Sequence, residues 1–167
     1  MNTTYHVQMS CTGLKNIATF GATDPFLKFF RPNNIEGLAD FCDPSSVGIK
    51  NWVLVYQTEE IMNNLNPVFK PFSLSGHRFC HSNPRLPMLC EVWGWKSNGS
   101  HKWIASFCFY PLDILQKKSM SYTFVDKKLK SSGSGTFISM DCETQIGFLD
   151  YLFHGVNLIP MVAIDFT

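Results

Sequence analysis

The chain has 167 residues, with 14 Lys and Arg against 13 Asp and Glu, and 45% of its residues are hydrophobic. This length and composition predict one folded domain with a sizeable core and exclude overall disorder. The near-zero net charge excludes a bulk nucleic-acid-binding surface. The most apolar tract, 148–166, is interrupted by charged and polar residues, so it is not predicted to span a bilayer.

Short apolar segments separated by Gly, Pro, Asn and Ser predict an all-β structure before residue 146. The predicted strands lie, in chain order, at 7–11, 25–30, 52–58, 68–74, 88–92, 103–109, 122–125 and 136–140. Loops are expected over 31–51, 63–67 and 96–101, a short helical turn over 111–115, and a basic, then Gly/Ser-rich connection over 126–135. Many short strands of this kind are typical of an antiparallel sandwich.

The character of the sequence changes after Gly147, where 148–153 suits a helix and 161–166 suits a buried strand. The six cysteines occur singly, and the first residues do not form a signal peptide. Free thiols in a reducing compartment are the simplest account of this pattern, which predicts a cytoplasmic location.

Several blocks of the sequence, taken together, resemble one protein family. The blocks, in chain order, are 20–27 (FGATDPFL), 58–72 (TEEIMNNLNPVFKPF), 97–101 (SNGSH), 147–155 (GFLDYLFHG) and 162–167 (VAIDFT). Residues 1–146 are similar to the second C2 domain of copines, and residues 147–167 are similar to the start of their A domain. The resemblance implies an eight-stranded antiparallel C2 β-sandwich over 1–146. It also implies that 147–167 form a linker helix and the first strand of a truncated A domain of the von Willebrand type, so that the chain is a divergent or truncated member of the family.

The resemblance also identifies where a C2 domain would bind calcium, with about five aspartates on two loops. The matching positions here are Ala18, Asp24, Gly94, Lys96 and Lys102. Calcium needs six to eight oxygen ligands, and only one of these residues carries a carboxylate. Asp24 is therefore the one calcium-ligand position that survives, and it could equally cap a turn through backbone amides. We expect no bound calcium and no other cofactor.

The same loop end is rich in aromatic and cationic side chains. Because Trp93 and Trp103 fall within predicted strands, Phe20 and Trp95 are the better candidates for exposure. Together with Lys96 and Lys102 they predict a surface that docks on anionic phospholipid or on a partner protein. A second basic patch is predicted from the residues Lys117, Lys118, Lys127, Lys128 and Lys130. A solvated edge that discourages aggregation is the alternative interpretation of this patch.

Other chemistry receives little support from the sequence. The group His77, Cys80 and His81, with Cys90 or His101 as a fourth ligand, matches no common zinc spacing. No nucleophile lies beside a placed base, and no phosphate-binding loop occurs, so an enzyme is not expected. Asp165 begins the metal motif of an A domain, but the motif's serines are absent.

These patterns predict a copine-like C2 module that docks peripherally on phospholipid at the plasma membrane. Docking depends on calcium in the family and is expected to be independent of calcium in this chain. Two alternatives stay open at this point: a protein–protein interaction domain that uses the aromatic loop end, and an inactive truncated paralogue. Nucleic acid is not an expected partner.

Overall fold

The computed structural model describes residues 2–33 and 52–147, which contain eight β-strands and two short helices. The elements are, in chain order, β1 (Asn2–Thr12), β2 (Pro25–Pro32), β3 (Trp52–Gln57), β4 (Phe72–Ser75), α1 (Gly76–Cys80), β5 (Met88–Gly94), β6 (Lys102–Phe109), α2 (Pro111–Leu115), β7 (Ser121–Val125) and β8 (Ser131–Gln145). All strand pairs are antiparallel. The all-β, eight-stranded antiparallel prediction is confirmed.

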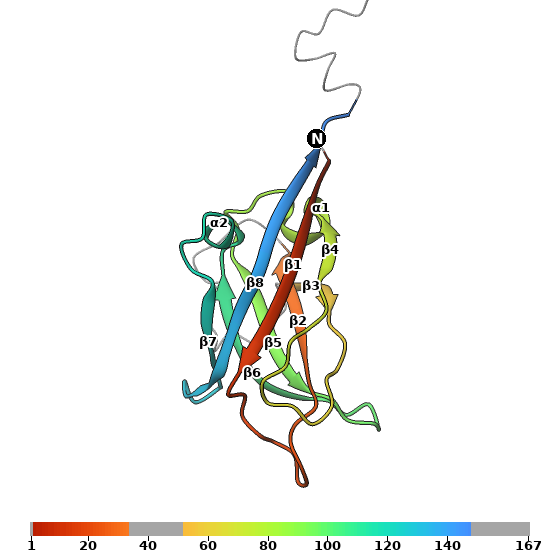
Figure 1. The fold of residues 1–167 in the computed structure, drawn as a ribbon, viewed down its shortest axis with the longest axis vertical. Helices are drawn as coiled ribbons and strands as arrows, with labels where there is room; N and C mark the ends of the chain where they lie inside the picture. Colours follow the sequence, from red (N-terminus) through yellow and green to blue (C-terminus); the bar gives the residue numbers. More distant parts are fainter. Residues whose placement is uncertain (1, 34–51, 148–167) are drawn as a thin grey trace, which may run out of the picture.

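The strands follow one another in the order β3-β2-β5-β6-β7-β8-β1-β4. The joint between β6 and β7 is a single residue pair, Ser106 with Val125, whereas β1 and β8 pair along nearly their whole length. The series therefore divides into two four-stranded sheets, β3-β2-β5-β6 and β7-β8-β1-β4, which form the sandwich shown in Figure 1.

A crossing segment, residues 58–69, runs between β3 and β4 and ties the two sheets together at one end. Its first half hydrogen-bonds to the start of β2, and its second half to the end of β1. The main-chain bonds are Thr58 N to Leu27 O (2.9 Å), Ile61 N to Pro25 O (3.0 Å), Asn64 N to Thr23 O (3.1 Å), Leu14 N to Leu65 O (3.1 Å), Cys11 N to Pro67 O (2.8 Å) and Phe69 N to Met9 O (3.0 Å). The loops at this end are thus held by backbone bonds to two sheets.

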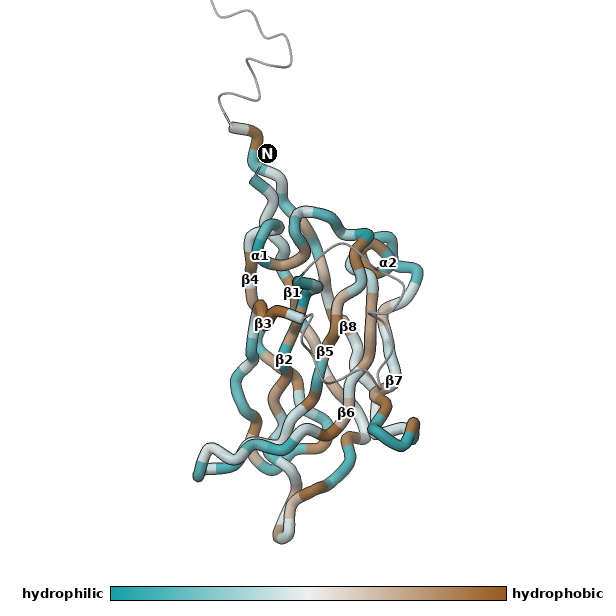
Figure 2. Tube along the Cα trace, turned by 180° about the vertical axis from the view of Figure 1, so that it is seen from behind, coloured by the Kyte–Doolittle hydropathy of each residue, from teal (hydrophilic) through white to brown (hydrophobic). Residues whose placement is uncertain are grey.

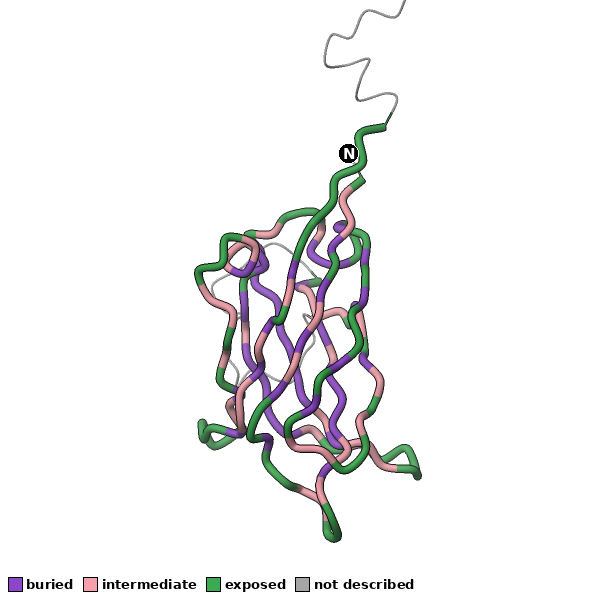
Figure 3. Tube along the Cα trace, viewed as in Figure 1, coloured by how far each residue is buried: buried purple, intermediate pink, exposed green. Residues whose placement is uncertain are grey.

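The core between the sheets is strongly aromatic, and buried residues run along the strands while exposed residues gather in the loops (Figure 3). Phe107 packs on Phe124 with ring centroids 4.8 Å apart, and Phe109 packs on Phe137 at 4.9 Å. These are favourable spacings for tilted and edge-to-face ring pairs. The apolar residues that alternate along β1 and β5 in the sequence are the ones that face this core.

The predicted limits of three strands were wrong. β1 begins at Asn2 and not at residue 7. β4 begins at Phe72 and not at residue 68, because Val68 makes only an isolated bridge with Ser10. β8 begins at Ser131, inside the tract that was expected to be a loop. Gly135 in this tract has a packing role, because a Cβ at that position would lie 2.9 Å from the Phe107 ring.

The short helix α1 was not predicted from the sequence. Ser75 caps it, since its Oγ accepts from Arg78 N (3.4 Å), and His81 ends it in a left-handed conformation. Five residues are too few to show helical periodicity. The predicted helical turn over 111–115 is confirmed as α2. None of the helices in the described ranges is long and apolar enough to cross a membrane.

The predictions for the C-terminal extension lie outside the described residues. They comprise the helix over 148–153, the strand over 161–166 and the start of a metal motif at Asp165. Most of the predicted 31–51 connection also lies outside them, although β2 extends to Pro32.

One carboxyl group is buried in the middle of the β2-β5-β6 sheet. Glu91 on β5 is only 1% exposed and pairs with Lys28 on β2 and Ser106 on β6. Its Oε2 has no hydrogen-bond partner in the described part of the chain. Burial raises the pKa of Glu91 to about 7, against the opposing effect of Lys28.

This raised pKa predicts that the fold loses stability as pH rises from the ordinary carboxyl value toward 7. Between pH 4.5 and about 7 the unfolded chain carries an ionised Glu91 while the folded chain keeps it protonated, so folding takes up a proton. The replacement Glu91→Gln removes this cost. We expect it to raise the free energy of unfolding at pH 8 by on the order of 1–3 kcal/mol, and with it the melting temperature. At pH 4.5 both should change much less.

Thermal melts of the parent and variant at both pH values measure this effect. The matched control is Glu60→Gln, which changes an exposed carboxyl group in the same way. An equal effect of Glu91→Gln at both pH values would show that ionisation of this side chain does not limit stability.

Candidate functional site

Four connections meet at the end of the sandwich where the crossing segment ties the sheets, and Figure 1 shows them at the bottom of the molecule. They are the β1–β2 loop (13–24), the crossing segment (58–69), the β5–β6 loop (95–101) and the β7–β8 hairpin (126–130). We call this region the loop end. In the view of Figure 2, hydrophilic and hydrophobic stretches alternate along these connections.

Asp24, the one carboxylate among the predicted calcium-ligand positions, links three connections of the loop end. Its Oδ1 accepts a hydrogen bond from Asn63 N at 2.6 Å. Asn63 in turn accepts from Ala22 N through its Oδ1 at 2.5 Å, and its backbone is left-handed (φ 52°). The Asp24 carbonyl accepts from Trp95 N at 2.8 Å. Asp24 therefore connects the β1–β2 loop to the crossing segment and to the β5–β6 loop.

A cavity of about 490 Å³ lies where the resemblance places the calcium site. Its walls include Ala18, Asp24, Gly94 and Lys96, four of the five matching positions. Asp24 is the only carboxylate among the residues that line it. A Cβ at Gly94 would lie 2.7 Å from Ile17 Cδ1, so Ile17 fills the space next to that position. The cavity offers one carboxylate, already engaged, and one ammonium group, which is a poor donor set for calcium.

Three large apolar side chains are exposed at turns and bends of the loop end, and a fourth exposed residue, Val68, forms the isolated bridge to Ser10. Phe20 is 92% exposed, Met62 is 61% exposed and Leu129 is 69% exposed. They come from three different connections, and Phe20 and Met62 both line the cavity. We call them the apolar tips. The exposure of Phe20 was predicted from the sequence, whereas that of Met62 and Leu129 was not. The signal available for Leu129 was a single apolar residue among three lysines.

Trp95 was expected to be exposed, and the structure places it half-buried instead. Its ring stacks on His101, with centroids 6.2 Å apart. The His101 ring also packs edge-on against Phe26 at 5.2 Å, and its Nδ1 accepts from Lys96 N at 3.0 Å. These contacts hold the β5–β6 loop against the sandwich.

The predicted cations do not form the two groups that the sequence suggested. Lys96 lines the cavity, whereas Lys102 lies on a separate groove of about 520 Å³. We call this the lysine groove, and its lining residues are Lys15, Lys102, Trp103, Ile104, Asp126, Lys127, Lys128 and Lys130. Lys15 is a member that sequence reasoning missed, because it is far from the hairpin along the chain.

The other two predicted members of the basic patch lie elsewhere. Lys117 and Lys118 follow α2, where their backbone amides donate to Ile114 O (2.9 Å) and Asp113 O (2.8 Å). Figure 1 places α2 at the opposite end of the sandwich from the β7–β8 hairpin. The predicted patch is therefore divided between two ends of the molecule.

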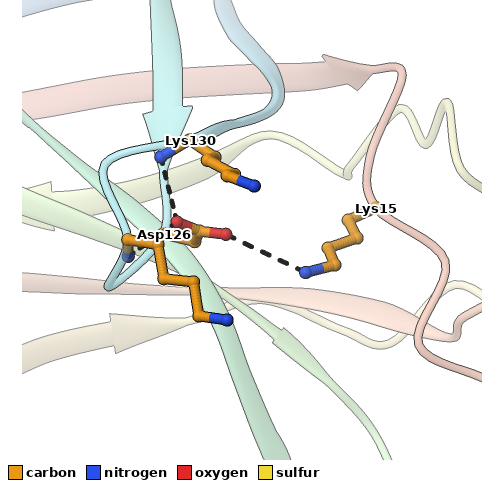
Figure 4. A network of polar contacts seen from close by, with 4 residues as sticks. Lys15, Asp126 and Lys130 are labelled. Atoms are coloured by element: carbon orange, nitrogen blue, oxygen red, sulfur yellow. Dashed lines mark hydrogen bonds and ion pairs between the residues drawn. The ribbon is translucent and has the colours of Figure 1, made fainter.

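The β7–β8 hairpin is shaped by Asp126. Its Oδ1 accepts from Lys128 N (2.8 Å) and Lys130 N (3.0 Å), and its Oδ2 lies 3.9 Å from Lys15 Nζ (Figure 4). The amide of Lys130, followed by that of Lys128 and the Lys15 ammonium group, lowers the pKa of Asp126. Its negative charge is thus taken up within the hairpin and by Lys15.

A close backbone contact brings the start of β8, which follows the hairpin, next to the β1–β2 loop. A Cβ on Gly133 would lie only 2.7 Å from Gly13 O and 2.8 Å from Thr12 O. Gly133 also has a left-handed backbone (φ 96°), which glycine adopts without strain. This contact allows Lys15 to reach Asp126.

The metal ligands considered in the sequence do not converge. His77 in α1 and His81 at its end have ring centroids 6.1 Å apart, while Cys80 and Cys90 are fully buried in the core. Within the described ranges, no group of three or more His, Cys, Asp or Glu could hold a metal ion.

No family model matches the chain. Among solved structures, it is similar to BON1-C2B, with a TM-score of 0.64 and 20% identity over 86% of this chain and 93% of that one. It is also similar to a C2 domain of plant extended synaptotagmin 1 (TM-score 0.55, 15% identity, 86% and 97% covered). A third similar structure holds a calcium-bound pair of C2 domains of extended synaptotagmin 2 (TM-score 0.51, 11% identity, 85% and 45% covered). The chain has the fold of C2 domains.

The donor set at the cavity predicts that calcium has no effect on this domain. An ion present at about 100 times its dissociation constant stabilises a protein by about 2.7 kcal/mol, which corresponds to several degrees in melting temperature. We expect no such rise in millimolar calcium, because four of the five matching positions lack a carboxylate. Thermal melts in calcium and, as a control for ionic strength, in magnesium measure this. A rise with calcium alone would show that the loop end still binds the ion.

Proposed function

We propose that the chain is a non-catalytic, copine-like C2 module whose loop end docks on anionic phospholipid at the plasma membrane without calcium. The observation that carries this proposal is the exposure of the apolar tips on three connections of one end, beside the lysine groove. An amphipathic surface of this kind suits a membrane interface, where apolar side chains enter the lipid and cations meet the headgroups.

The magnitudes of the two contributions support reversible docking. Moving one large apolar side chain out of water is favourable by roughly 1.5–3 kcal/mol. Each cation near an anionic membrane surface adds about 1 kcal/mol. Neither contribution is sufficient alone for stable anchoring, and their combination gives binding that salt weakens.

Leu129 supports the proposal because its position is unfavourable for folding. Its backbone is left-handed (φ 57°), which costs a residue with a Cβ roughly 1–2 kcal/mol. Its side chain is mostly exposed and adds little to the core. Glycine or asparagine would adopt this conformation more readily. A leucine between Lys128 and Lys130 is better explained by a contact outside the chain.

Binding to a partner protein is the second candidate function, and the cavity beside Phe20 favours it. This cavity has apolar walls at Ile17, Ala18 and Met62 and could receive one apolar side chain of a partner. Vesicles made of lipid alone separate the two functions, because they contain no protein to bind.

Replacing the apolar tips tests membrane docking directly. We expect Phe20→Ser to weaken binding to vesicles of phosphatidylserine and phosphatidylcholine about tenfold or more in the presence of a calcium chelator, because an inserted ring is removed from the interface. Leu129→Asn should also weaken binding while leaving the melting temperature equal or higher, since asparagine tolerates the left-handed backbone. Vesicle sedimentation and thermal melts provide the two measurements.

The matched control for these variants is Ile138→Ser, which removes an apolar side chain that is 48% exposed on β8, away from the loop end. If Ile138→Ser weakens sedimentation as much as Phe20→Ser does, the loop end has no special part in docking. If the parent chain does not sediment with any vesicle, the partner-protein function is favoured.

A further inference from the structure

The lysine groove gathers more positive charge than any other described feature of the loop end. Five lysines and a single carboxylate line it, and they come from three separate parts of the chain. Lys15 follows β1, Lys102 begins β6, and the other three lie on the β7–β8 hairpin. A groove with one sign of charge concentrates ligands of the opposite sign.

The one carboxylate in the groove is not available to neutralise these lysines. Asp126 is engaged by two hairpin amides and by Lys15. Within the part of the chain that the structure describes, the side chains of Lys102, Lys127, Lys128 and Lys130 form no ion pair. Four ammonium groups are therefore left to attract an anion from outside.

The floor of the groove helps to position these cations. Trp103 and Ile104 on β6 form part of its lining, and the Lys127 ammonium group lies 5.7 Å from the centre of the Trp103 ring. This distance is within the range of a cation–π contact. The Asp126 bonds set the turn that carries Lys128 and Lys130, as Figure 4 shows for Lys130. The groove is thus partly organised before a ligand arrives.

The chemistry that best matches such a groove is a phosphomonoester. This group carries about −1.5 to −2 charges at neutral pH and several acceptor oxygens in a small volume. A lysine ammonium group binds phosphate as a point charge with three donors. The phosphatidylserine headgroup, by contrast, has one net charge and an ammonium group of its own, which the lysines would repel.

We propose that the lysine groove binds the phosphomonoester groups of a polyphosphorylated phosphatidylinositol headgroup. A lipid is favoured over a free phosphate because an apolar tip adjoins the groove along the chain: the exposed Leu129 lies between Lys128 and Lys130, two of the residues that line the groove. An apolar side chain flanked by cations fits a bilayer surface and has no use with a small soluble anion. This inference rests on the proposed membrane docking and names the headgroup that directs it.

The test compares two double variants of the full chain on two kinds of vesicle. Lys127→Gln/Lys128→Gln removes two charges from the groove, and Lys117→Gln/Lys118→Gln removes two exposed charges beside α2. The vesicles have equal surface charge, one kind carrying phosphatidylserine and the other phosphatidylinositol bisphosphate. We expect the parent to prefer the second kind, and the groove variant to lose on the order of tenfold to thirtyfold in affinity for it. The control variant should keep both the affinity and the preference.

Two outcomes would overturn the proposal. If the parent binds both kinds of vesicle equally, the groove responds to surface charge and not to the phosphomonoester. If the two double variants lose the same affinity, the position of the lysines does not matter. In either case Phe20→Ser still reports on docking by the apolar tips, so the failure of this inference and that of the proposed function are distinguishable.

Two soluble probes identify other ligands for the groove. If inositol trisphosphate binds saturably, requires Lys127 and Lys128, and no vesicle binds, the ligand of the groove is a soluble phosphate compound and not a lipid. If polyglutamate competes with vesicles for the protein as strongly as inositol trisphosphate does, the ligand of the groove is an acidic protein. Both results count against the proposal, and melting temperatures confirm that each variant is folded.

Discussion

The hydrogen bonds that the crossing segment makes to both sheets determine the shape of the loop end. Each bond contributes only about 0.5–1.5 kcal/mol, but six of them join β1, β2 and the segment into one unit. Asn63 lies in the middle of this unit, so its bonds with Asp24 and Ala22 fix the β1–β2 loop to a rigid neighbour. The exposed Phe20 is carried by that loop, so its position depends on these main-chain bonds and on Asn63.

The same packing explains how the loops converge without an ion. Several carboxylates at one site repel one another, and a divalent cation has to offset that repulsion. In this chain Ile17 packs against Gly94 and Ala18 replaces a carboxylate, so apolar contact occupies part of the space. Asp24, the remaining acid, is turned toward the Asn63 amide. These contacts hold the loops together within the protein itself, which supports the proposal that docking does not need calcium.

The sequence predicted the strands better than it predicted the site, and the reason is physical. Alternation with a period of two reports which side chains face the core, so β2, β5 and β6 were located within one or two residues. The Gly/Ser-rich start of β8 was predicted to be a loop, because only the structure shows the Phe107 ring that Gly135 must accommodate. At the site, the exposure of Phe20 could be predicted, whereas the stacking of Trp95 on His101 and the approach of Lys15 to the hairpin depend on tertiary contacts.

The arrangement of the loop end indicates why docking would need both kinds of side chain. Lysine attraction acts over about 8 Å at physiological ionic strength and falls as salt is added, so it orients the domain before contact. Apolar insertion acts only at contact and is little affected by salt. In the β7–β8 hairpin both are present within three residues, Lys128, Leu129 and Lys130, on a turn held by Asp126. The left-handed backbone of Leu129 is a cost to folding that its largely exposed side chain does little to offset in the described part of the chain, and insertion of that side chain into a bilayer would offset it only when the domain is bound.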